Sequence, residues 1–229
     1  MVKEKNIPQC IGIIMDGNRR WARERGLTTF EGHLKGYQKL KEVISWAHEA
    51  GVKDLIFYGF STENWNRSTD EVASLMKILE TALIDELAIL TKEGVRILFI
   101  GDRSCFSQKI QDGMTRAEKE TMSNTNGTVT LALSYGGRQE IVNATNALLR
   151  EGKREINEKD FAEHLSTAST PDPDIIIRPG GEKRLSNFLP WQSTYSELFF
   201  CDTYWPDFSK KDFLDILLEF SKRERRHGK

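Results

Sequence analysis

The sequence predicts a single α/β domain over residues 1–229, with a mainly parallel central sheet of about six strands flanked by helices. The first observation behind this is an alternation of short apolar runs with longer amphipathic runs, the pattern of successive strand–helix–strand units. The second is that the short runs are almost continuously apolar, as expected when both faces of a sheet are covered. The third is the length of 229 residues, 38% of them hydrophobic, which suffices for one sizeable core.

The first elements are two strands with a helix between them. Residues 10–15 and 55–60 are apolar and strand-sized, and residues 36–50 have helical spacing, with Gly51 as the stop signal. The apolar positions of this helix that share one face are Tyr37, Leu40, Val43, Ile44 and Ala47.

A long helix follows over residues 70–92, opened by a capping-box pattern at Ser68 and Glu71. One apolar stripe on it comprises Val72, Leu75, Met76, Leu79, Leu83, Leu87 and Leu90. Further apolar residues widen this stripe: Ala73, Ile78, Ile84, Ala88 and Ile89. A helix that is apolar on most sides is buried on most sides, either between the sheet and a subunit interface or as the wall of an apolar tunnel.

The remaining elements continue the same alternation. Expected strands are residues 95–100, 129–133, 174–177 and 198–200, and expected helices are residues 107–122, 139–150 and 158–165. Ser209 and Asp212 form a second capping-box pattern, which opens a terminal helix. Its inward residues are Phe213, Ile216, Leu217 and Phe220.

Composition excludes several classes of protein. With 33 basic and 34 acidic residues the net charge is −1, which disfavours a generic nucleic-acid binder. The longest apolar runs, at residues 55–60 and 97–100, are far short of the ~20 residues that span a bilayer. Residues 1–8 are polar, so no signal peptide is expected. The three cysteines have no metal-ligand spacing and are expected to be thiols in a reducing cytoplasm: Cys10, Cys105 and Cys201.

Polar clusters follow four of the expected strands, at residues 16–21, 61–67, 134–138 and 178–186. In parallel α/β sheets, ligands bind outside the carboxyl ends of the strands. Arginine occurs in all four clusters and glycine in three, so guanidinium groups and glycine amides predict a phosphate or diphosphate site. Asp16, among these arginines, is a candidate ligand for magnesium. Taken singly, each cluster is better explained as a turn or a solvated arginine, and it is their common placement at strand ends that favours an anion site.

Common phosphate-binding and metal-binding motifs are absent from the sequence. It contains neither G-x-x-x-x-G-K-[ST] nor G-x-G-x-x-G, so a Walker NTPase and a Rossmann dinucleotide enzyme are unsupported. Histidine and cysteine spacings do not indicate structural zinc. A phosphate-ester hydrolase would need a nucleophile or a two-metal carboxylate cluster, and neither is visible.

Several motifs in order resemble the cis-prenyltransferase family, that of undecaprenyl diphosphate synthase, over nearly the whole chain. They are IIMDGNRRWA at residues 13–22, Gly32-His33, FSTENWNR at residues 60–67, SYGGR at residues 134–138, IRPGGEKRLSNFLPWQSTYSELFF at residues 177–200, and Trp205-Pro206-Asp207. As in that family, the aspartate-rich motifs of trans-prenyltransferases are missing.

The resemblance implies a reaction and its partners. Isopentenyl diphosphate is added to an allylic diphosphate, typically farnesyl diphosphate, with Mg²⁺ as cofactor and with a new cis double bond in each round. The growing chain would occupy an apolar tunnel, which gives the wide apolar helix a purpose. The resemblance further implies a cytoplasmic homodimer with at most peripheral membrane association.

Roles for individual residues follow from the same resemblance. Asp16 matches the essential magnesium-binding aspartate, and Glu197 matches a second magnesium-linked acid near or across the dimer interface. Asn64 matches the proton acceptor; because an amide is a poor base, we expect a relay through water or diphosphate. The allylic side comprises Gly17, Asn18, Arg19, Arg20, Trp21 and His33. The substrate segment adds Ser61, Thr62, Glu63, Trp65 and Arg67. The isopentenyl diphosphate site comprises Arg178, Arg184, Leu185 and Ser186. The terminal element that reaches the neighbouring subunit comprises Arg226 and Gly228.

Four positions depart from the family pattern. Thr29 stands where an arginine is usual, and Arg19, Arg23 or Arg25 are candidates to replace its charge. Pro179 replaces Thr or Ser and is expected to shift its loop, because proline lacks a backbone donor and fixes φ. The other two departures are Ser134 in place of Asn and Pro190 in place of Leu.

The sequence favours a medium-to-long product of the undecaprenyl class, a carrier lipid for cell-wall glycan synthesis. The long apolar helix has no further insertion, and Gly59 is small where bulk in its strand would block a tunnel. Two alternatives remain open. One is a short-chain or atypical prenyl diphosphate synthase, and the other is a non-catalytic partner subunit of a prenyltransferase. The intact Asp16 and Ser-x-Glu-Asn segment argue for catalysis.

Overall fold

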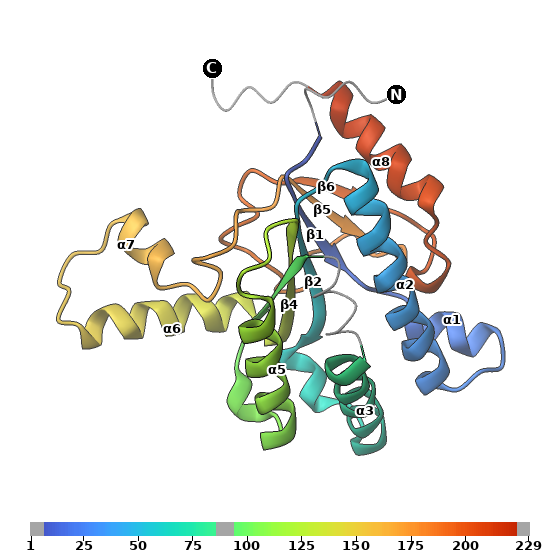
Figure 1. The fold of residues 1–229 in the computed structure, drawn as a ribbon, viewed down its shortest axis with the longest axis horizontal. Coiled ribbons are helices and arrows are strands. Elements are labelled where there is room, and N and C mark those ends of the chain that lie inside the picture. The colour runs from blue at the N-terminus through green and yellow to red at the C-terminus, as the bar shows by residue number, and fades with distance from the viewer. Residues whose placement is uncertain (1–6, 86–93, 224–229) are drawn as a thin grey trace.

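The computed structural model describes residues 7–85 and 94–223, and its centre is one six-stranded sheet in the order β3-β4-β2-β1-β5-β6 (Figure 1). All five strand pairs are parallel. The strands are β1 (Cys10–Ile14), β2 (Asp54–Ser61), β3 (Val95–Ile100), β4 (Gly127–Tyr135), β5 (Ile175–Arg178) and β6 (Glu197–Phe200). The predicted fold class and the six predicted strands are confirmed.

Seven helices in the described ranges accompany the sheet. They are α1 (Asn18–Glu24), α2 (Thr29–Ala50), α3 (Thr69–Asp85), α5 (Gln108–Thr121), α6 (Gly137–Arg150), α7 (Glu158–Glu163) and α8 (Lys210–Lys222). Short 3₁₀ segments are η1 (Thr62–Asn66), η2 (Arg103–Cys105) and η3 (Trp205–Asp207). In Figure 1, α6 and α7 extend away from the sheet as an arm, whereas α2 and α8 lie against it.

The main core lies on the face of the sheet that α2 and α8 cover. Alternate strand residues such as Ile11, Ile13 and Phe57 pack there against Val43 of α2 and Phe213 of α8, and all five are fully buried. Burial of such side chains contributes ~1.5–3 kcal/mol each, which makes this layer a principal source of stability. The four predicted inward residues of the terminal helix are buried in the same core.

The opposite face of the sheet is covered at its centre by a loop. Phe188 and Leu189, between β5 and β6, are fully buried against Ile56 and Tyr58 of β2 and Ile176 of β5. The Phe188 and Tyr58 rings stack with centroids 4.7 Å apart. The prediction that both faces of the sheet are covered is confirmed. At the centre of this second face, however, the covering segment is a loop and not the helix that the sequence pattern had predicted.

Helix α2 begins at Thr29, seven residues before the predicted start. Thr28 and Glu31 form a complete capping box: Thr28 Oγ1 accepts from Glu31 N at 3.2 Å, and Glu31 Oε2 accepts from Thr28 N at 2.8 Å. The T-x-x-E pattern is visible in the sequence and was the signal for this earlier start. Helix α1 was not predicted, because a segment of seven mostly polar residues is too short to show a helical repeat of apolar positions.

The two predicted capping boxes have different outcomes. At α8, Ser209 and Asp212 satisfy each other's backbone amides, as predicted. At α3, Ser68 Oγ accepts from Glu71 N at 3.4 Å, but the Glu71 carboxylate accepts from Arg67 instead, at 2.8 Å. That carboxylate is turned toward the candidate site. The part of the expected apolar helix beyond Asp85, including Leu87, Ala88, Ile89 and Leu90, lies outside the described residues, as does the side chain of Ile84.

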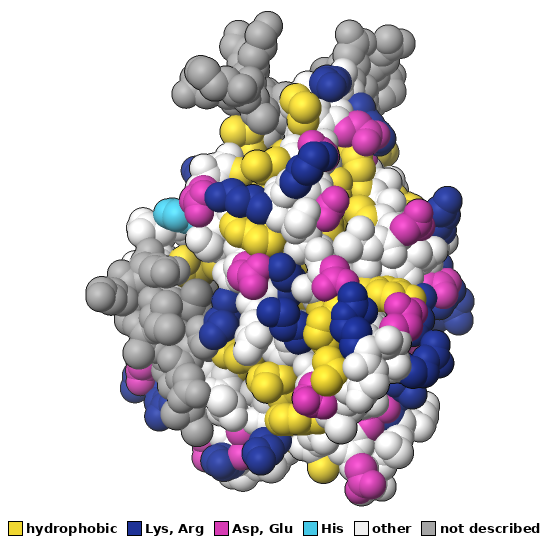
Figure 2. Space-filling model, turned by 90° about the vertical axis from the view of Figure 1, so that its right-hand side faces the viewer, with side chains coloured by type: hydrophobic (Ala, Val, Ile, Leu, Met, Phe, Trp, Pro, Cys, Tyr) yellow, Lys and Arg dark blue, Asp and Glu magenta, His cyan; other side chains and the backbone are white. Residues whose placement is uncertain are grey.

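The molecular surface carries both signs of charge. On the face formed by α1, α2 and α8, basic and acidic side chains lie interspersed (Figure 2), as a net charge of −1 implies. Among the helices in the described ranges, none is both long and apolar enough to cross a membrane.

Candidate active site

A cavity of about 1540 Å³ begins where the strands end and continues between the sheet and helices α2 and α3. Its polar end is lined by Asp16, Asn18, Arg19, Arg20, His33, Ser61, Glu63, Asn64, Arg67, Arg178, Arg184 and Ser186. Its apolar part is lined by Leu75, Met76, Ile78, Leu79, Leu83, Ile97, Phe99, Val129, Leu131 and Leu133. The described part of the wide apolar helix is therefore a cavity wall, and the predicted tunnel is continuous with the predicted polar site.

Asp16 lies at the tip of β1, between two arginines. Its Oδ1 accepts from Arg20 Nη2 at 3.1 Å, and its Oδ2 accepts from Arg178 Nη2 at 2.7 Å. The next residue, Gly17, has φ 103°, and a Cβ there would lie 2.6 Å from the Tyr204 ring. Only glycine fits this close approach in a left-handed conformation, so the turn that orients Asp16 depends on it.

Arg178 ends β5 and is the most buried cation of the site, with 4% of its surface exposed. Its Nη2 holds Asp16, while its Nη1 donates to Ser186 Oγ at 2.8 Å and to the backbone oxygen of Arg184. A buried guanidinium requires such partners, because an unpaired charge costs several kcal/mol there. Arg178 thereby joins the tip of β1 to the loop that follows β5.

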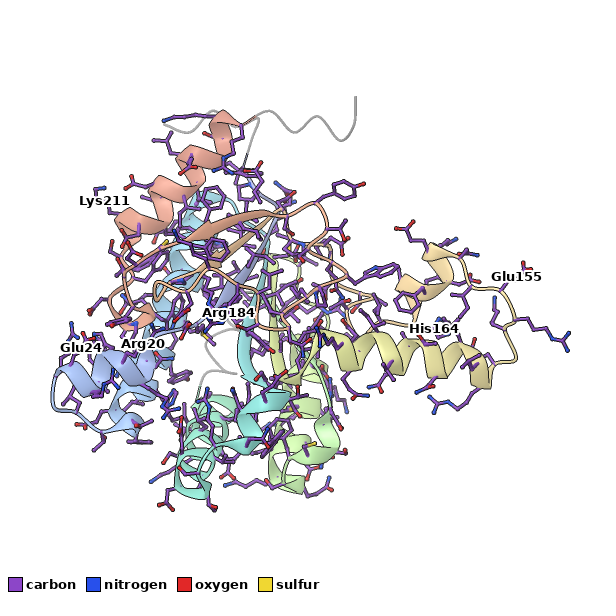
Figure 3. The ribbon with its side chains drawn as sticks, turned by 180° about the vertical axis from the view of Figure 1, so that it is seen from behind. Arg20, Glu24, Glu155, His164, Arg184 and Lys211 are labelled. Atoms are coloured by element: carbon purple, nitrogen blue, oxygen red, sulfur yellow. The ribbon has the colours of Figure 1, made fainter. Side chains whose placement is uncertain are left out.

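Arg20 of α1 and Arg184 of the loop after β5, both labelled in Figure 3, line the cavity. Glu182 lies between them, with Oε1 3.7 Å from Arg20 Nη1 and Oε2 2.5 Å from Arg184 Nη1. Arg184 has 60% of its side chain exposed and can turn toward an entering anion. Glu182 was not predicted as a site residue. Its position in the sequence, directly before Lys183 and Arg184, could have indicated that it pairs with a cation of the site.

A second carboxylate that sequence reasoning missed is Glu71, which gathers three cationic or potentially cationic side chains. Its Oε1 lies 2.8 Å from Arg67 Nη1, 3.4 Å from His33 Nε2 and 3.6 Å from Arg19 Nε. Burial and the neighbouring Arg67 lower the pKa of His33, although Glu71 acts in the opposite direction. The net effect favours the neutral form of the His33 imidazole.

The segment after β2 is folded as the 3₁₀ turn η1 and carries Glu63 and Asn64 into the cavity. Asn64 Oδ1 accepts from the backbone N of Ser61 at 3.1 Å, which fixes the orientation of its amide. Burial opposes ionisation of Glu63, but hydrogen bonds from its own backbone, Asn187, Ser61 and Thr62 lower its pKa overall.

Two residues predicted to contact substrate, Trp21 and Trp65, are not among the residues that line the cavity. Trp21 packs behind the site: its Nε1 donates to Asp207 Oδ1 at 2.8 Å, and it does not line the cavity. Trp65 likewise lies outside the cavity lining, with Nε1 donating to Ser134 Oγ at 3.0 Å and its ring 4.7 Å from Phe60. Both indoles stabilise the segments that carry the site.

Three more predicted residues lie off the cavity wall. Thr62 donates to Glu63 at 3.2 Å, and Leu185 packs against the core beneath the loop. Glu197 begins β6, at the edge of the sheet opposite the tip of β1, and its Oε2 accepts from Arg223 at 2.7 Å. Within one chain it therefore cannot join Asp16. The predicted Arg226 and Gly228 lie outside the described residues.

Three glycine amides of the predicted phosphate-binding loops already donate to backbone carbonyls of the protein. Gly180 N and Gly181 N donate to the carbonyls of Thr203 and Cys201, each at 2.8 Å, and Gly137 N donates to Asn187 O at 2.9 Å. These amides are already satisfied, so the charge for an anion comes mainly from the arginines. The bonds of Gly180 and Gly181 hold the loop after Pro179 against residues 201–203, which follow β6.

The cation missing at Thr29 has two replacements within reach. Thr29, Arg19 and Arg23 all line the cavity. Arg25, the third candidate, is committed elsewhere: its Nη2 lies 2.7 Å from Asp207 Oδ2 and its guanidinium lies 4.7 Å from the Trp21 ring. Arg19 and Arg23 therefore remain as compensating charges.

The donor set at Asp16 fits a magnesium ion that is shared with a bound diphosphate. In the described ranges, no group of three or more His, Cys, Asp or Glu side chains could enclose a metal ion. Asp16 has 27% of its side chain exposed and faces the cavity. Mg²⁺ is commonly held by one or two carboxylates together with substrate phosphate oxygens, which matches this arrangement.

The fold and the site define a class of protein: an α/β enzyme with arginines and an aspartate for diphosphate groups at the mouth of a long apolar cavity. A family model described as putative undecaprenyl diphosphate synthase matches residues 14–228, and the chain belongs to this cis-prenyltransferase family.

Relatives and solved structures agree with this assignment. An isoprenyl transferase of Fusobacterium nucleatum is 44% identical over 98% of this chain and 97% of that protein. A tritrans,polycis-undecaprenyl-diphosphate synthase (geranylgeranyl-diphosphate specific) of Pyrococcus horikoshii is 45% identical over 100% of this chain and 89% of that protein. Lavandulyl diphosphate synthase from Lavandula x intermedia, solved with dimethylallyl diphosphate, superposes with a TM-score of 0.93 at 38% identity, covering 97% of this chain and 99% of that one.

Proposed function

We propose that the protein condenses isopentenyl diphosphate with an allylic diphosphate, farnesyl diphosphate in the first instance, to give a medium- or long-chain cis-polyprenyl diphosphate. The observation that carries this is the continuity between the arginine-rich mouth and the apolar cavity of about 1540 Å³. A diphosphate head and a growing hydrocarbon tail need these two environments side by side. An undecaprenyl-type carrier lipid for cell-wall glycan synthesis is the product that we favour.

Each group of residues has a role in this reaction. Arg19, Arg20 and Arg23 of the α1 region bind the allylic diphosphate, and Arg178, Arg184 and Ser186 bind isopentenyl diphosphate. Asp16, together with diphosphate oxygens, would hold a magnesium ion, which would neutralise charge on the departing diphosphate. Arginines pre-arranged in a partly desolvated site stabilise the same developing charge without reorganisation.

The proton lost from the isopentenyl unit leaves near η1. Asn64 lines the cavity with its amide oxygen held by Ser61 N, so the amide nitrogen is available to orient a water molecule or a diphosphate oxygen. Because an amide is a poor base, we propose that the water molecule or diphosphate oxygen that Asn64 orients accepts the proton. We further propose that the enzyme acts as a cytoplasmic homodimer in which Glu197, Arg226 and Gly228 serve the partner's site, with at most peripheral contact to a membrane.

The test is incorporation of radiolabelled isopentenyl diphosphate. The purified chain, with magnesium, is offered dimethylallyl, geranyl, farnesyl and geranylgeranyl diphosphate in turn, and products are separated by chain length. A ladder that ends in long cis-polyprenyl diphosphates supports the proposal. No incorporation with any primer would contradict it and would favour a non-catalytic partner subunit.

A short-chain or atypical product is the second candidate function. Thr29 lines the cavity at a position where the family resemblance implies an arginine, and the structural similarity to lavandulyl diphosphate synthase reaches a TM-score of 0.93. The same incorporation experiment separates the two candidates. A short-chain synthase would give products of roughly two or three five-carbon units, that is, diphosphates of about ten to fifteen carbons.

Product length is expected to fall when Gly59 is enlarged. Gly59 lines the cavity, and a Cβ there would lie 2.9 Å from Leu133 Cδ2 and 4.0 Å from Met15 Cε. In Gly59→Leu the side chain enters the apolar part, so we expect the longest product to shorten by about two or more isoprene units, since a packed interior has no spare room. Leu149→Ala, at a side chain of α6 that is 59% exposed and does not line the cavity, is the control for handling and stability. An unchanged ladder in Gly59→Leu would show that the chain grows elsewhere.

A further inference from the structure

The side chain of Asn187 joins segments that follow three different strands. Asn187 lies in the loop after β5, and its Nδ2 donates to Glu63 Oε1 in η1, after β2, at 2.9 Å. Its Oδ1 accepts from the backbone N of Arg138, at the start of α6 after β4, at 2.9 Å. Asn187 itself lines the cavity.

The backbone at Asn187 is committed to the same junction. Its carbonyl accepts from Gly137 N at 2.9 Å, and its φ of 68° lies in the left-handed region. Asparagine is one of the few residues other than glycine that adopt this conformation readily. A Cβ at Gly136 would come within 2.8 Å of Asn187 Nδ2, so the glycine leaves room for the side chain.

The two sides of this junction carry residues for the two reacting molecules. The loop holds Arg184 and Ser186, which are fixed in turn by Arg178, and η1 holds Glu63 and Asn64. Within η1, the side chain of Thr62 donates to Glu63 and that of Trp65 donates to Ser134, so neither bonds to the loop that carries Asn187. The Asn187–Glu63 hydrogen bond is therefore a direct link between the isopentenyl diphosphate loop and the segment with the proton-accepting group.

We propose that Asn187 is a positioning residue, which holds η1 at the distance from the isopentenyl diphosphate loop that proton removal requires. This inference rests on the proposed function, because it takes Ser186 and Asn64 as residues of that reaction. Asn187 acts through Glu63 and needs no contact with substrate. Neither its hydrogen bonds nor its left-handed backbone were visible from the spacing of motifs in the sequence.

Replacing Asn187 by aspartate changes one property of the junction. Aspartate keeps the shape, tolerates the left-handed backbone and still accepts from Arg138 N, where a helix N-terminus favours negative charge. It loses the donor and brings a second carboxylate to the 2.9 Å contact with Glu63. Two facing carboxylates repel each other, so η1 is expected to move away from the loop.

The test is a double-mutant cycle with Glu63→Gln. In the Glu63→Gln background, the introduced amide can donate to the carboxylate that Asn187→Asp introduces, which restores a hydrogen bond of reversed direction. With Glu63 present, we expect Asn187→Asp to lower kcat for isopentenyl transfer by about 30-fold. In the Glu63→Gln background, we expect a loss of less than about 3-fold. The difference between these two losses is within the coupling measured for residues in contact. KM for the allylic primer is expected to change little, since the α1 arginines are untouched. An equal loss in both backgrounds would overturn the proposal.

Hydrogen exchange on the same four proteins gives a readout that needs no turnover. We expect faster amide exchange in residues 61–67 for Asn187→Asp, and exchange in the double variant equal to that of Glu63→Gln alone. Unchanged amide exchange in Asn187→Asp would overturn the proposal that Asn187 holds η1 in position. If the wild-type protein incorporates no isopentenyl diphosphate but the exchange coupling is present, the proposed function fails and the positioning of η1 by Asn187 stands.

Discussion

Asp16→Asn is expected to lower kcat for prenyl transfer by about 10³-fold, the loss of several kcal/mol of transition-state charge stabilisation. Asparagine keeps the shape of the side chain but supplies no negative charge for a cation on the leaving diphosphate. Its amide oxygen still accepts from one of the two arginines that now bond to Asp16, at 3.1 and 2.7 Å. We therefore expect the free energy of unfolding to fall by only about 1–2 kcal/mol.

The matched control is Asp174→Asn, a carboxylate at the opposite edge of the sheet. Asp174 Oδ2 accepts from Gln9 N at 2.7 Å and from Cys10 N at 3.3 Å, so its loss affects stability and not chemistry. Steady-state kinetics and urea unfolding of both variants are the measurements. Prenyl transfer by Asp16→Asn within about tenfold of wild type would remove Asp16 from the metal-binding role, since tenfold corresponds to ~1.4 kcal/mol.

Arg178→Lys is expected to cost both activity and stability. Lysine keeps the charge but cannot hold Asp16 with one nitrogen while binding Ser186 and the Arg184 carbonyl with another, as the guanidinium does. At a position with 4% exposure, the poorly paired ammonium lowers the free energy of unfolding by about 2–4 kcal/mol. We expect kcat/KM for isopentenyl diphosphate to fall by ~10²-fold, because the loop loses its support.

Arg184→Lys is the comparison for this prediction. Arg184 carries the same charge in the same loop, but 60% of its side chain is exposed. Its replacement is expected to raise KM for isopentenyl diphosphate and to leave the free energy of unfolding within the range of ordinary surface substitutions, about ±0.5 kcal/mol. Equal stability losses in the two variants would show that burial of Arg178 has no energetic consequence.

Much of the candidate site was predictable because parallel strands end at one edge of the sheet. Asp16, Ser61, Asn64 and Arg178 each follow or end a strand, and all four line one cavity. The apolar period of residues 70–85 predicted a buried helix and left open whether it faced a tunnel or an interface; in the structure Leu83 is buried, but most of the other described side chains of α3 are half-buried or exposed. The cavity between α2, α3 and the sheet resolves this in favour of a tunnel wall.

Residues whose role depends on distant partners were harder to predict. Glu71 matched a capping box, but its carboxylate pairs with the charges of Arg67 and Arg19 and lies 3.4 Å from the imidazole of His33. A complete capping box at this position would remove the carboxylate from that ion-pair cluster. Trp21 and Trp65 matched substrate-contacting positions, yet the hydrogen bonds of their indoles turn them behind the site.

The sequence by itself determined the order of strands and helices, the residues at the strand tips and the family to which they belong. These properties follow from local periodicity and from motifs read along the chain. The tertiary structure alone decided which polar side chains meet. Trp21 and Asp207 are 186 residues apart, Asp16 and Arg178 are 162 apart, and Asn187 and Glu63 are 124 apart. Such contacts depend on the packing of the whole sheet, because a side chain donates to whichever partner the fold brings within about 3 Å of it.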